Sequence, residues 1–168
     1  MTPHHIALGD DAVQSFSTNL KMNPPLRSME HRDAILQALA DGTVDAIATD
    51  HAPHHFDEKN VEFDLAPFGV IGLETAFGVC YTRLQKVVAL ARLIDLFSCG
   101  PARIFNLPGG TLQRGTLGDV TLIDTKARYQ VTNTFRSKAS NSPFIGEALT
   151  GRPVATVVGG VVKFDLRV

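Results

Sequence analysis

One short stretch gathers most of the side chains that could do chemistry. Residues 48–55 read Ala-Thr-Asp-His-Ala-Pro-His-His, which places Asp50, His51, His54 and His55 within six residues. Carboxylate oxygen and imidazole nitrogen are both zinc ligands. The alternative is a polar loop with solvated histidines after a core strand. One acid grouped with three histidines favours the functional interpretation.

The residues ahead of this stretch predict how it is presented. Val44 and residues 46–48 form an apolar run that is typical of a buried strand. The run ends at Thr49, and Pro53 prevents further regular pairing. Parallel α/β sheets and barrels present catalytic groups in this way, at the carboxyl ends of their strands.

A helix is predicted immediately before the strand. Ser28 is suited to the N-cap and Gly42 to the residue after the last turn. The preceding connector, residues 22–27, contains two successive prolines and is therefore extended. Between the two caps, apolar residues recur at helical spacing: Ala34, Ile35, Ala38 and Leu39. Helix and strand together indicate half of a parallel βα repeat.

A long polar loop is predicted after the strand, from His51 to Gly69. Loops of this length in compact domains are usually functional or disordered. Its middle, residues 57–62, is charged and is predicted to be solvated and mobile, with no chemical role for Asp57, Glu58 or Lys59. Its end, residues 66–69, reads Ala-Pro-Phe-Gly and is predicted to be fixed.

The rest of the chain divides into a helical part and a strand-rich part. Near the start, residues 2–8 are predicted as a strand end followed by a loop. Helices are predicted over residues 73–84, 88–97 and 100–107, and strands over 111–115, 119–124 and 154–164. Gly159-Gly160 supplies the turn of a hairpin in the last of these. We therefore predict a barrel segment over 1–111 and a small β subdomain over 112–168.

Bulk properties exclude several classes of protein. The net charge of −1 offers no basic surface for nucleic acid, and no run approaches the roughly 20 apolar residues of a membrane span. Cys80 and Cys99 form no C-x-x-C pair, so we expect buried free thiols in a reducing cytosol. The first residues lack the regions of a signal peptide, and a cytoplasmic location is expected.

The predicted barrel segment is incomplete. A (β/α)₈ barrel takes about 250 residues, whereas this chain has 168 and one strong barrel-type strand. A parallel strand that is buried on both faces needs neighbours on both edges. Those neighbours come from a partner or from a longer protein.

Several motifs together resemble one family, the bacterial dihydroorotases of the amidohydrolase superfamily. Hydantoinases and allantoinases match the same motifs less well. The resemblance covers essentially the whole chain and looks like the C-terminal two-fifths of such an enzyme. It is carried by Thr2-Pro-His-His5, Met22-Asn-Pro-Pro-Leu-Arg27, Ala48-Thr-Asp-His-Ala-Pro-His54, Ala66-Pro-Phe-Gly69, Gly72-Leu-Glu-Thr75 and Pro101-Ala-Arg-Ile-Phe105.

The resemblance implies an α/β fold: the C-terminal part of a (β/α)₈ TIM-like metallo-dependent hydrolase barrel, with a small β-sandwich, incomplete in this chain. It implies one or two zinc ions and interconversion of N-carbamoyl-L-aspartate and L-dihydroorotate in pyrimidine synthesis. By the resemblance, Asp50 is a zinc ligand and the general acid/base. Asn23 and His54 hold the substrate, and the backbone of Phe68 and Gly69 contacts its ring.

Each of these residues also has a plainer interpretation. Asp50 could cap the following turn, Asn23 could fix the proline connector, His54 could be solvated, and Gly69 could serve a simple turn. The family's other metal ligands have no counterpart here. His4 and His5 lie one strand beyond the last histidine ligand of the family, so we expect them to be structural or to support the site indirectly.

Three hypotheses follow. The chain is part of a zinc dihydroorotase that is inactive alone, or a non-catalytic half-barrel or scaffold that binds another chain. A third reading keeps the enzyme but makes it act on a hydantoin or allantoin ring. The expected partners are the small-molecule substrate together with the missing N-terminal barrel half, a second copy of the chain, or aspartate transcarbamoylase.

Overall fold

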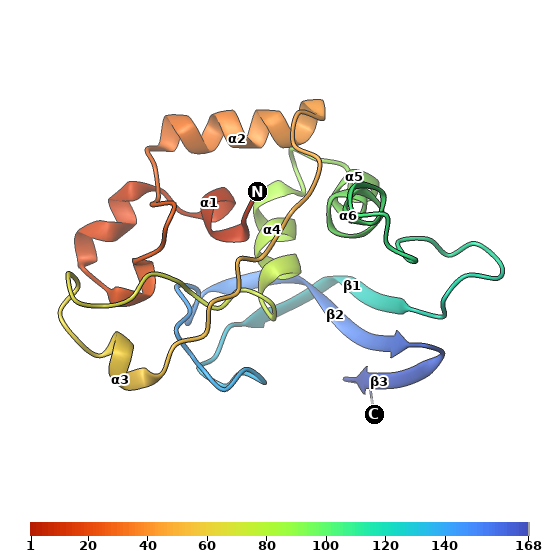
Figure 1. Ribbon diagram of the computed structural model, residues 1–168. Coiled ribbons are helices and arrows are strands. Elements are labelled where there is room, and N and C mark those ends of the chain that lie inside the picture. Colours follow the sequence, from red (N-terminus) through yellow and green to blue (C-terminus); the bar gives the residue numbers. More distant parts are fainter. Residues whose placement is uncertain (168) are drawn as a thin grey trace.

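A computed structural model describes residues 1–167 as a layer of helices over a small antiparallel sheet (Figure 1). Within these residues, none of the helices has the length and apolar character that crossing a membrane requires. The helical elements are α1 (Pro3–Ala7), η1 (Asp10–Ser15), η2 (Thr18–Leu20), α2 (Met29–Asp41), α3 (Phe56–Lys59), α4 (Ala76–Leu84), α5 (Leu90–Ile94), η3 (Asp95–Cys99) and α6 (Gly100–Ile104). The strands are β1 (Val120–Gln130), β2 (Ala148–Val158) and β3 (Val161–Asp165).

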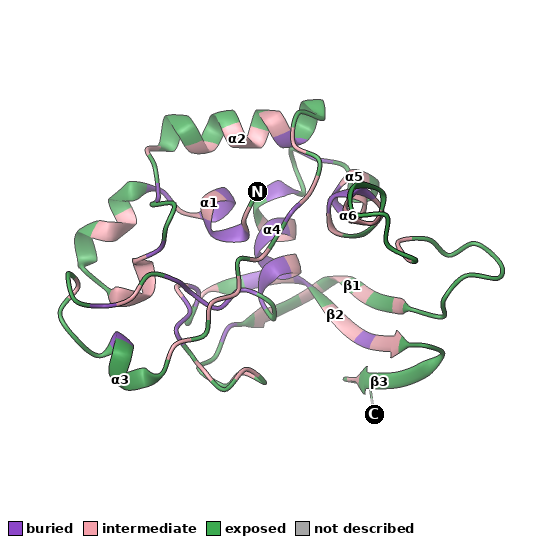
Figure 2. Cartoon of the chain, viewed as in Figure 1, coloured by how far each residue is buried: buried purple, intermediate pink, exposed green. Residues whose placement is uncertain are grey.

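Helix α4 occupies the centre of the helical layer, and its buried residues contrast with the exposed outer face of α2 (Figure 2). The predicted helix before the strand is confirmed, because α2 follows Ser28 and ends at Gly42, whose φ of 93° only glycine adopts easily. Ser28 does not cap it with its side chain, and its hydroxyl lies 2.7 Å from His31 Nδ1 instead. The main core joins α1, α2, α4 and α5 through Ile6, Leu39, Ile47, Cys80, Leu84, Val88, Leu93 and Leu96.

The predicted buried strand before Asp50 is not part of a sheet in the described residues. Residues 44–49 lie outside any helix or strand, Asp50 has a left-handed φ of 51°, and within the range only Ile47 is buried. Its amide donates to Leu96 O at 2.9 Å, and Ala48 N donates to Met1 O at 2.9 Å. The Met1 ammonium donates to Ala46 O at 3.0 Å. The apolar run therefore lacks the neighbouring strands that would bury it.

The first residues form a helix, and the prediction of a strand end there is wrong. Thr2 is the N-cap of α1, and its hydroxyl oxygen accepts from His5 N at 3.4 Å. Pro3 occupies the first turn, where its missing N–H leaves no bond unmade. These local signals override the expectation of an extended segment.

The later helices lie where they were predicted, with shifted ends. The helix expected over 73–84 begins at Ala76. The one expected over 88–97 runs as α5 and continues through a wider π-type turn, η3, into α6. Residues 111–115 form no strand, so that prediction is wrong. Cys80 and Cys99 are free thiols as expected, but only Cys80 is buried, and Cys99 is partly exposed.

The sheet has the order β1-β2-β3, with antiparallel neighbours. The hairpin is confirmed, because Gly159 and Gly160 turn the chain with φ values of 57° and 77° between the paired residues Val158 and Val161. Within the described residues, no further strand is paired with β1 or β3.

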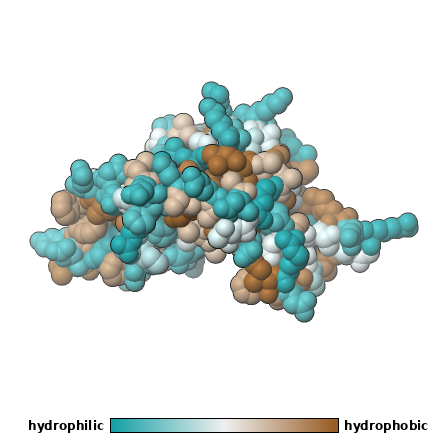
Figure 3. Space-filling model, turned by 90° about the horizontal axis from the view of Figure 1, so that it is seen from above, coloured by the Kyte–Doolittle hydropathy of each residue, from teal (hydrophilic) through white to brown (hydrophobic). Residues whose placement is uncertain are grey.

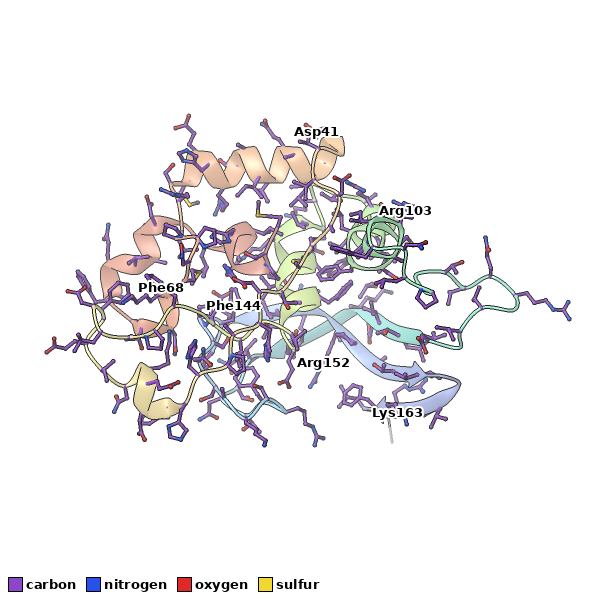
Figure 4. The ribbon with its side chains drawn as sticks, in the orientation of Figure 1. Asp41, Phe68, Arg103, Phe144, Arg152 and Lys163 are labelled. Carbon is purple, nitrogen blue, oxygen red and sulfur yellow. The ribbon has the colours of Figure 1, made fainter. Side chains whose placement is uncertain are left out.

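Helix α4 packs directly on the sheet. Gly78 allows this approach, because a side chain there would overlap the Tyr129 hydroxyl group of β1. A second cluster joins the two layers through Ala7, Val79, Val131, Phe144 and Leu149. Phe144 is seen close to α4 in Figure 4. Because helices and strands share this core, the division into segments 1–111 and 112–168 stays a prediction.

The surface above the helical layer carries no single apolar face. Figure 3 shows apolar atoms there in several separate patches between hydrophilic ones. Exposed apolar side chains also follow the last hairpin: Val158, Val161, Val162, Phe164 and Leu166.

Candidate functional site

Asp50 lies at the end of the segment 44–50, where it is exposed to solvent. Its φ is 51°, in the left-handed region that aspartate tolerates better than most residues. Among the described residues, no hydrogen bond or ion pair holds its carboxylate. The carboxylate is therefore free to accept a proton or a cation from the solvent side.

His51 has a structural role. Its Nδ1 accepts from two backbone amides ahead of α4, Gly72 N at 3.1 Å and Leu73 N at 3.3 Å. The same residue pairs with Val70 in an isolated parallel bridge. The lone pair on Nδ1 is thus used within the chain, which ties the end of this segment to the start of the central helix.

His54 connects two parts of the long loop. Its Nε2 lies 3.0 Å from Phe68 O, and its backbone N donates to Asn141 Oδ1 at 3.2 Å. Its Nδ1 lies 3.3 Å from Glu58 Oε2. Hydrogen bonds from the His55 backbone N–H first, and then from His54, lower the pKa of the Glu58 carboxyl group. His54 is therefore a half-buried, oriented imidazole, unlike the solvated alternative.

Phe68 and Gly69 form the far side of this contact. The Phe68 ring is 57% exposed and lies beside the segment that ends at Lys21, whose Nζ is 5.0 Å from the ring centroid (Figure 4). Gly69 has a φ of 123°, and a Cβ there would lie 2.6 Å from the Ala52 Cβ. Glycine is required at this position by conformation and by space.

The middle of the loop, residues 57–62, is exposed as predicted except at Lys59, which is buried. Residues 56–59 form helix α3, begun by a capping box between His55 and Glu58. The Lys59 side chain is buried, and Nζ donates to Pro67 O at 2.9 Å and to Gly69 O at 3.0 Å. Burial, and then the charge of Lys21, lowers the pKa of the Lys59 ammonium group. The burial of Lys59 could not be predicted from the charged sequence. A lysine can bury its aliphatic chain when its ammonium group donates to carbonyl oxygens.

Asn23 is exposed on its proline connector. His5 supports the connector, with Nε2 3.0 Å from Pro24 O and Nδ1 2.6 Å from Thr2 Oγ1. Among the described residues, no hydrogen bond joins Asn23 to His54 or to Asp50. The structure therefore brings His54, Phe68 and Gly69 together, and it leaves Asn23 and Asp50 as separate, exposed groups.

His4 is 2% exposed, and its Nε2 has no hydrogen-bond partner within residues 1–167. Burial, and to a lesser extent the neighbouring His5, lowers the pKa of His4 from 6.5 to about 4. Both histidines thus pack within or against the helical layer, and their contacts agree with the structural role expected for them.

The described residues do not complete a metal site. Across 1–167, no three or more His, Cys, Asp or Glu side chains are grouped so that they could hold an ion. A catalytic zinc needs about three protein ligands in addition to water. Asp50 alone does not fit that requirement.

Asn141 is the residue that sequence reasoning missed. It belongs to the segment between β1 and β2 and is 5% exposed. It contacts the loop on both sides of the candidate site. A cavity of about 270 Å³ lies against this contact, lined by polar groups that include Thr18, His54 and Lys59. Its position in the sequence carries no motif, and only the fold brings it to the loop.

Comparison with known proteins places this geometry in a family. The pattern of the amidohydrolase family matches residues 13–163. Dihydroorotase from Endomicrobium trichonymphae is 51% identical over 98% of this chain and 40% of its own length. Dihydroorotase from Bacillus subtilis (strain 168) is 49% identical over 98% of this chain and 39% of its own length. The chain thus spans about two-fifths of the length of these relatives, and the recognised resemblance is confirmed.

Solved structures show the same fold. The L-hydantoinase (dihydropyrimidinase) of Arthrobacter aurescens matches with a TM-score of 0.92 and 30% identity, over 98% of this chain and 38% of its own. The dihydropyrimidinase of Brevibacillus agri NCHU1002 matches in fold with a TM-score of 0.91 and 21% identity, over 99% and 39%. These likenesses confirm the predicted fold, an incomplete α/β barrel portion with a small sheet. The chain belongs to the amidohydrolase family.

Proposed function

We propose that this chain is part of a zinc-dependent dihydroorotase, a cyclic amide hydrolase that interconverts N-carbamoyl-L-aspartate and L-dihydroorotate in de novo pyrimidine synthesis. The contact of His54 Nε2 with Phe68 O at 3.0 Å carries the proposal. It joins two motifs that the resemblance assigns to substrate binding. Identities of 49% and 51% with named dihydroorotases support the same substrate.

In this proposal Asp50 moves the proton. Its exposed carboxylate accepts a proton from the attacking water and returns it to the departing amide nitrogen, as a general acid/base does. A metal ion, when bound, would supply the polarisation of the amide carbonyl. The amidohydrolase family generally depends on metal. The proposal requires metal ligands in addition to Asp50 from outside residues 1–167.

The substrate carboxylate is the expected ligand of His54 and Asn23. The Asn23 amide is an N–H donor, and the His54 Nε2–H, which faces Phe68 O, would turn from that carbonyl to the substrate carboxylate. Phe68 and Gly69 form the adjacent wall. The Gly69 N–H is occupied by Lys21 O at 2.9 Å, so the Phe68 amide is the more available backbone donor.

A hydantoin or allantoin ring is the second candidate substrate. The likeness to the Arthrobacter aurescens L-hydantoinase, at a TM-score of 0.92, favours it. The identity of 30% is lower than that with the dihydroorotases. Turnover of dihydroorotate, compared with that of hydantoin and allantoin, separates the two.

The proposed partners are the remaining barrel half, a second copy and aspartate transcarbamoylase, in the cytoplasm. The unpartnered sheet edges and the segment before Asp50 support the first of these. A non-catalytic half-barrel that binds another chain is the alternative. It predicts tight binding without turnover.

The experiment is a chimaera, called here the completed enzyme. The part of the Bacillus subtilis dihydroorotase that this chain does not match is placed in frame ahead of residue 1. We expect zinc-dependent turnover of dihydroorotate and little turnover of hydantoin or allantoin. A folded, zinc-loaded chimaera without dihydroorotase activity would contradict the proposal. Asp50→Asn in the same chimaera serves as the inactive control.

A further inference from the structure

The carbonyl oxygen of Gly69 accepts hydrogen bonds from two side chains, one within the long loop and one from the segment between β1 and β2. Lys59 Nζ lies at 3.0 Å and Asn141 Nδ2 at 3.2 Å. Both side chains are buried, with exposed fractions of 6% for Lys59 and 5% for Asn141. A hydrogen bond in such a setting is costly to remove, because the group left behind has no water to replace its partner.

Asn141 reaches both segments of the candidate site. Its Nδ2 also donates to Ala52 O at 2.9 Å, and its Oδ1 accepts from His54 N at 3.2 Å. Its own carbonyl accepts from Ile71 N at 3.0 Å. One amide side chain, which has donors and an acceptor, therefore fixes the distance between the His54 segment and the Gly69 segment.

Lys59 holds the same segment from within the loop. Its second bond, to Pro67 O at 2.9 Å, fixes the residue before Phe68. Its own carbonyl is anchored, because Thr18 Oγ1 donates to Lys59 O at 2.6 Å. The ammonium group thus connects the backbone on both sides of Phe68 to a fixed point.

We propose that Asn141 and Lys59 are positioning residues, a buried clamp that holds His54 and the Phe68–Gly69 backbone at the spacing needed to bind the substrate carboxylate. The clamp rests on the proposed function for the identity of the substrate. Neither residue touches the reacting atoms, so the clamp acts on substrate binding and leaves the proton transfer at Asp50 unchanged.

The test uses Asn141→Leu in the completed enzyme, which keeps the approximate volume and removes every side-chain hydrogen bond. We expect KM for dihydroorotate to rise about tenfold or more, the equivalent of one or two lost buried hydrogen bonds, with kcat within about threefold. Asn133→Leu is the matched control, because Asn133 is exposed on the same segment, and it should leave both constants unchanged.

A second variant tests the clamp independently, in case Asn141→Leu does not fold. Lys59→Met keeps the length of the stem and removes the donor, and Lys138→Met is its control on an exposed lysine. We expect the same pattern, a raised KM with kcat nearly unchanged. A fall in kcat with an unchanged KM for either clamp variant would overturn the proposed role.

Hydrogen exchange in the 168-residue chain separates the clamp from the function. In Asn141→Leu the amides of His54 and Ile71 should exchange at least about tenfold faster, because the first loses its acceptor and the second its fixed partner. Unchanged exchange overturns the clamp. Faster exchange with an unchanged KM overturns its role in substrate binding. An inactive completed enzyme overturns the proposed function, while exchange still decides whether the clamp exists.

Discussion

The segment that ends at Asp50 and the loop that follows it are held in place in different ways. Residues 51–73 are fixed by side chains from three directions, through His51, Lys59 and Asn141. Residues 44–50 are held by a few backbone bonds and one buried side chain, Ile47. The segment proposed to bind substrate is thus held within this chain, whereas the segment that ends at the proposed catalytic Asp50 lacks the neighbouring strands that a barrel would supply.

The largest expected effect concerns the chain alone. We predict no measurable hydrolysis of dihydroorotate by the isolated chain, with or without added zinc, because its described residues offer no three-ligand group. A sensitive assay of the purified chain against the completed enzyme checks this. Zinc-dependent turnover by the pure chain would contradict this prediction. His4, His5 and His51 would then need testing as zinc ligands.

The next prediction isolates the catalytic side. Asp50→Ala in the completed enzyme should lower kcat by about 10²–10⁴-fold and change KM far less, because the carboxylate is the proposed general acid/base. Steady-state kinetics over a range of dihydroorotate concentrations measure both constants. Turnover within a few-fold of the parent would show that the catalytic assignment is wrong.

Acid should loosen the two segments unequally. Because the pKa of His4 falls from 6.5 to about 4 on folding, the folded state binds fewer protons than the unfolded state between these values. Stability is therefore lost as pH falls from 6.5 to 4, by roughly 3 kcal/mol in all. Urea unfolding of the parent and of His4→Gln at several pH values should show the extra dependence only in the parent.

The position of His4 sharpens this prediction. Helix α1 follows Met1, which bonds to Ala46 and Ala48. Hydrogen exchange at pH 5 should therefore rise first in residues 44–50 and only later in residues 51–73. Equal loss of protection in both segments would mean that they unfold as one unit.

The smallest predicted effect belongs to the substrate side. His54→Ala should raise KM about tenfold, since one hydrogen bond to a charged group is lost, with a smaller change in kcat. The matched control is His31→Ala, because His31 is exposed on α2, away from the long loop. An unchanged KM in His54→Ala would remove this residue from the binding site.

The sequence predicted the local motifs but not the buried side chains that hold them in place. The α2 helix and the Gly159-Gly160 hairpin followed from local caps and turn residues, which act over a few positions. The burial of the predicted strand before Asp50 was wrong, because a strand is buried only when neighbouring strands pair with it. The sequence pattern of one segment does not show whether those strands are present. Asn141 and Lys59 could not be identified, because their roles depend on long-range contacts and on a buried charge within a polar loop.

The Asn141 contacts also set an order of assembly. His54 and Asn141 are 87 residues apart in the chain. At about 5–20 residues per second, a ribosome takes roughly 4–17 seconds to add that interval. During this time the loop exists without the side chain that spans it, exposed to chaperones and proteases. The loop that carries His54 is therefore synthesised well before the residue that completes its hydrogen bonds.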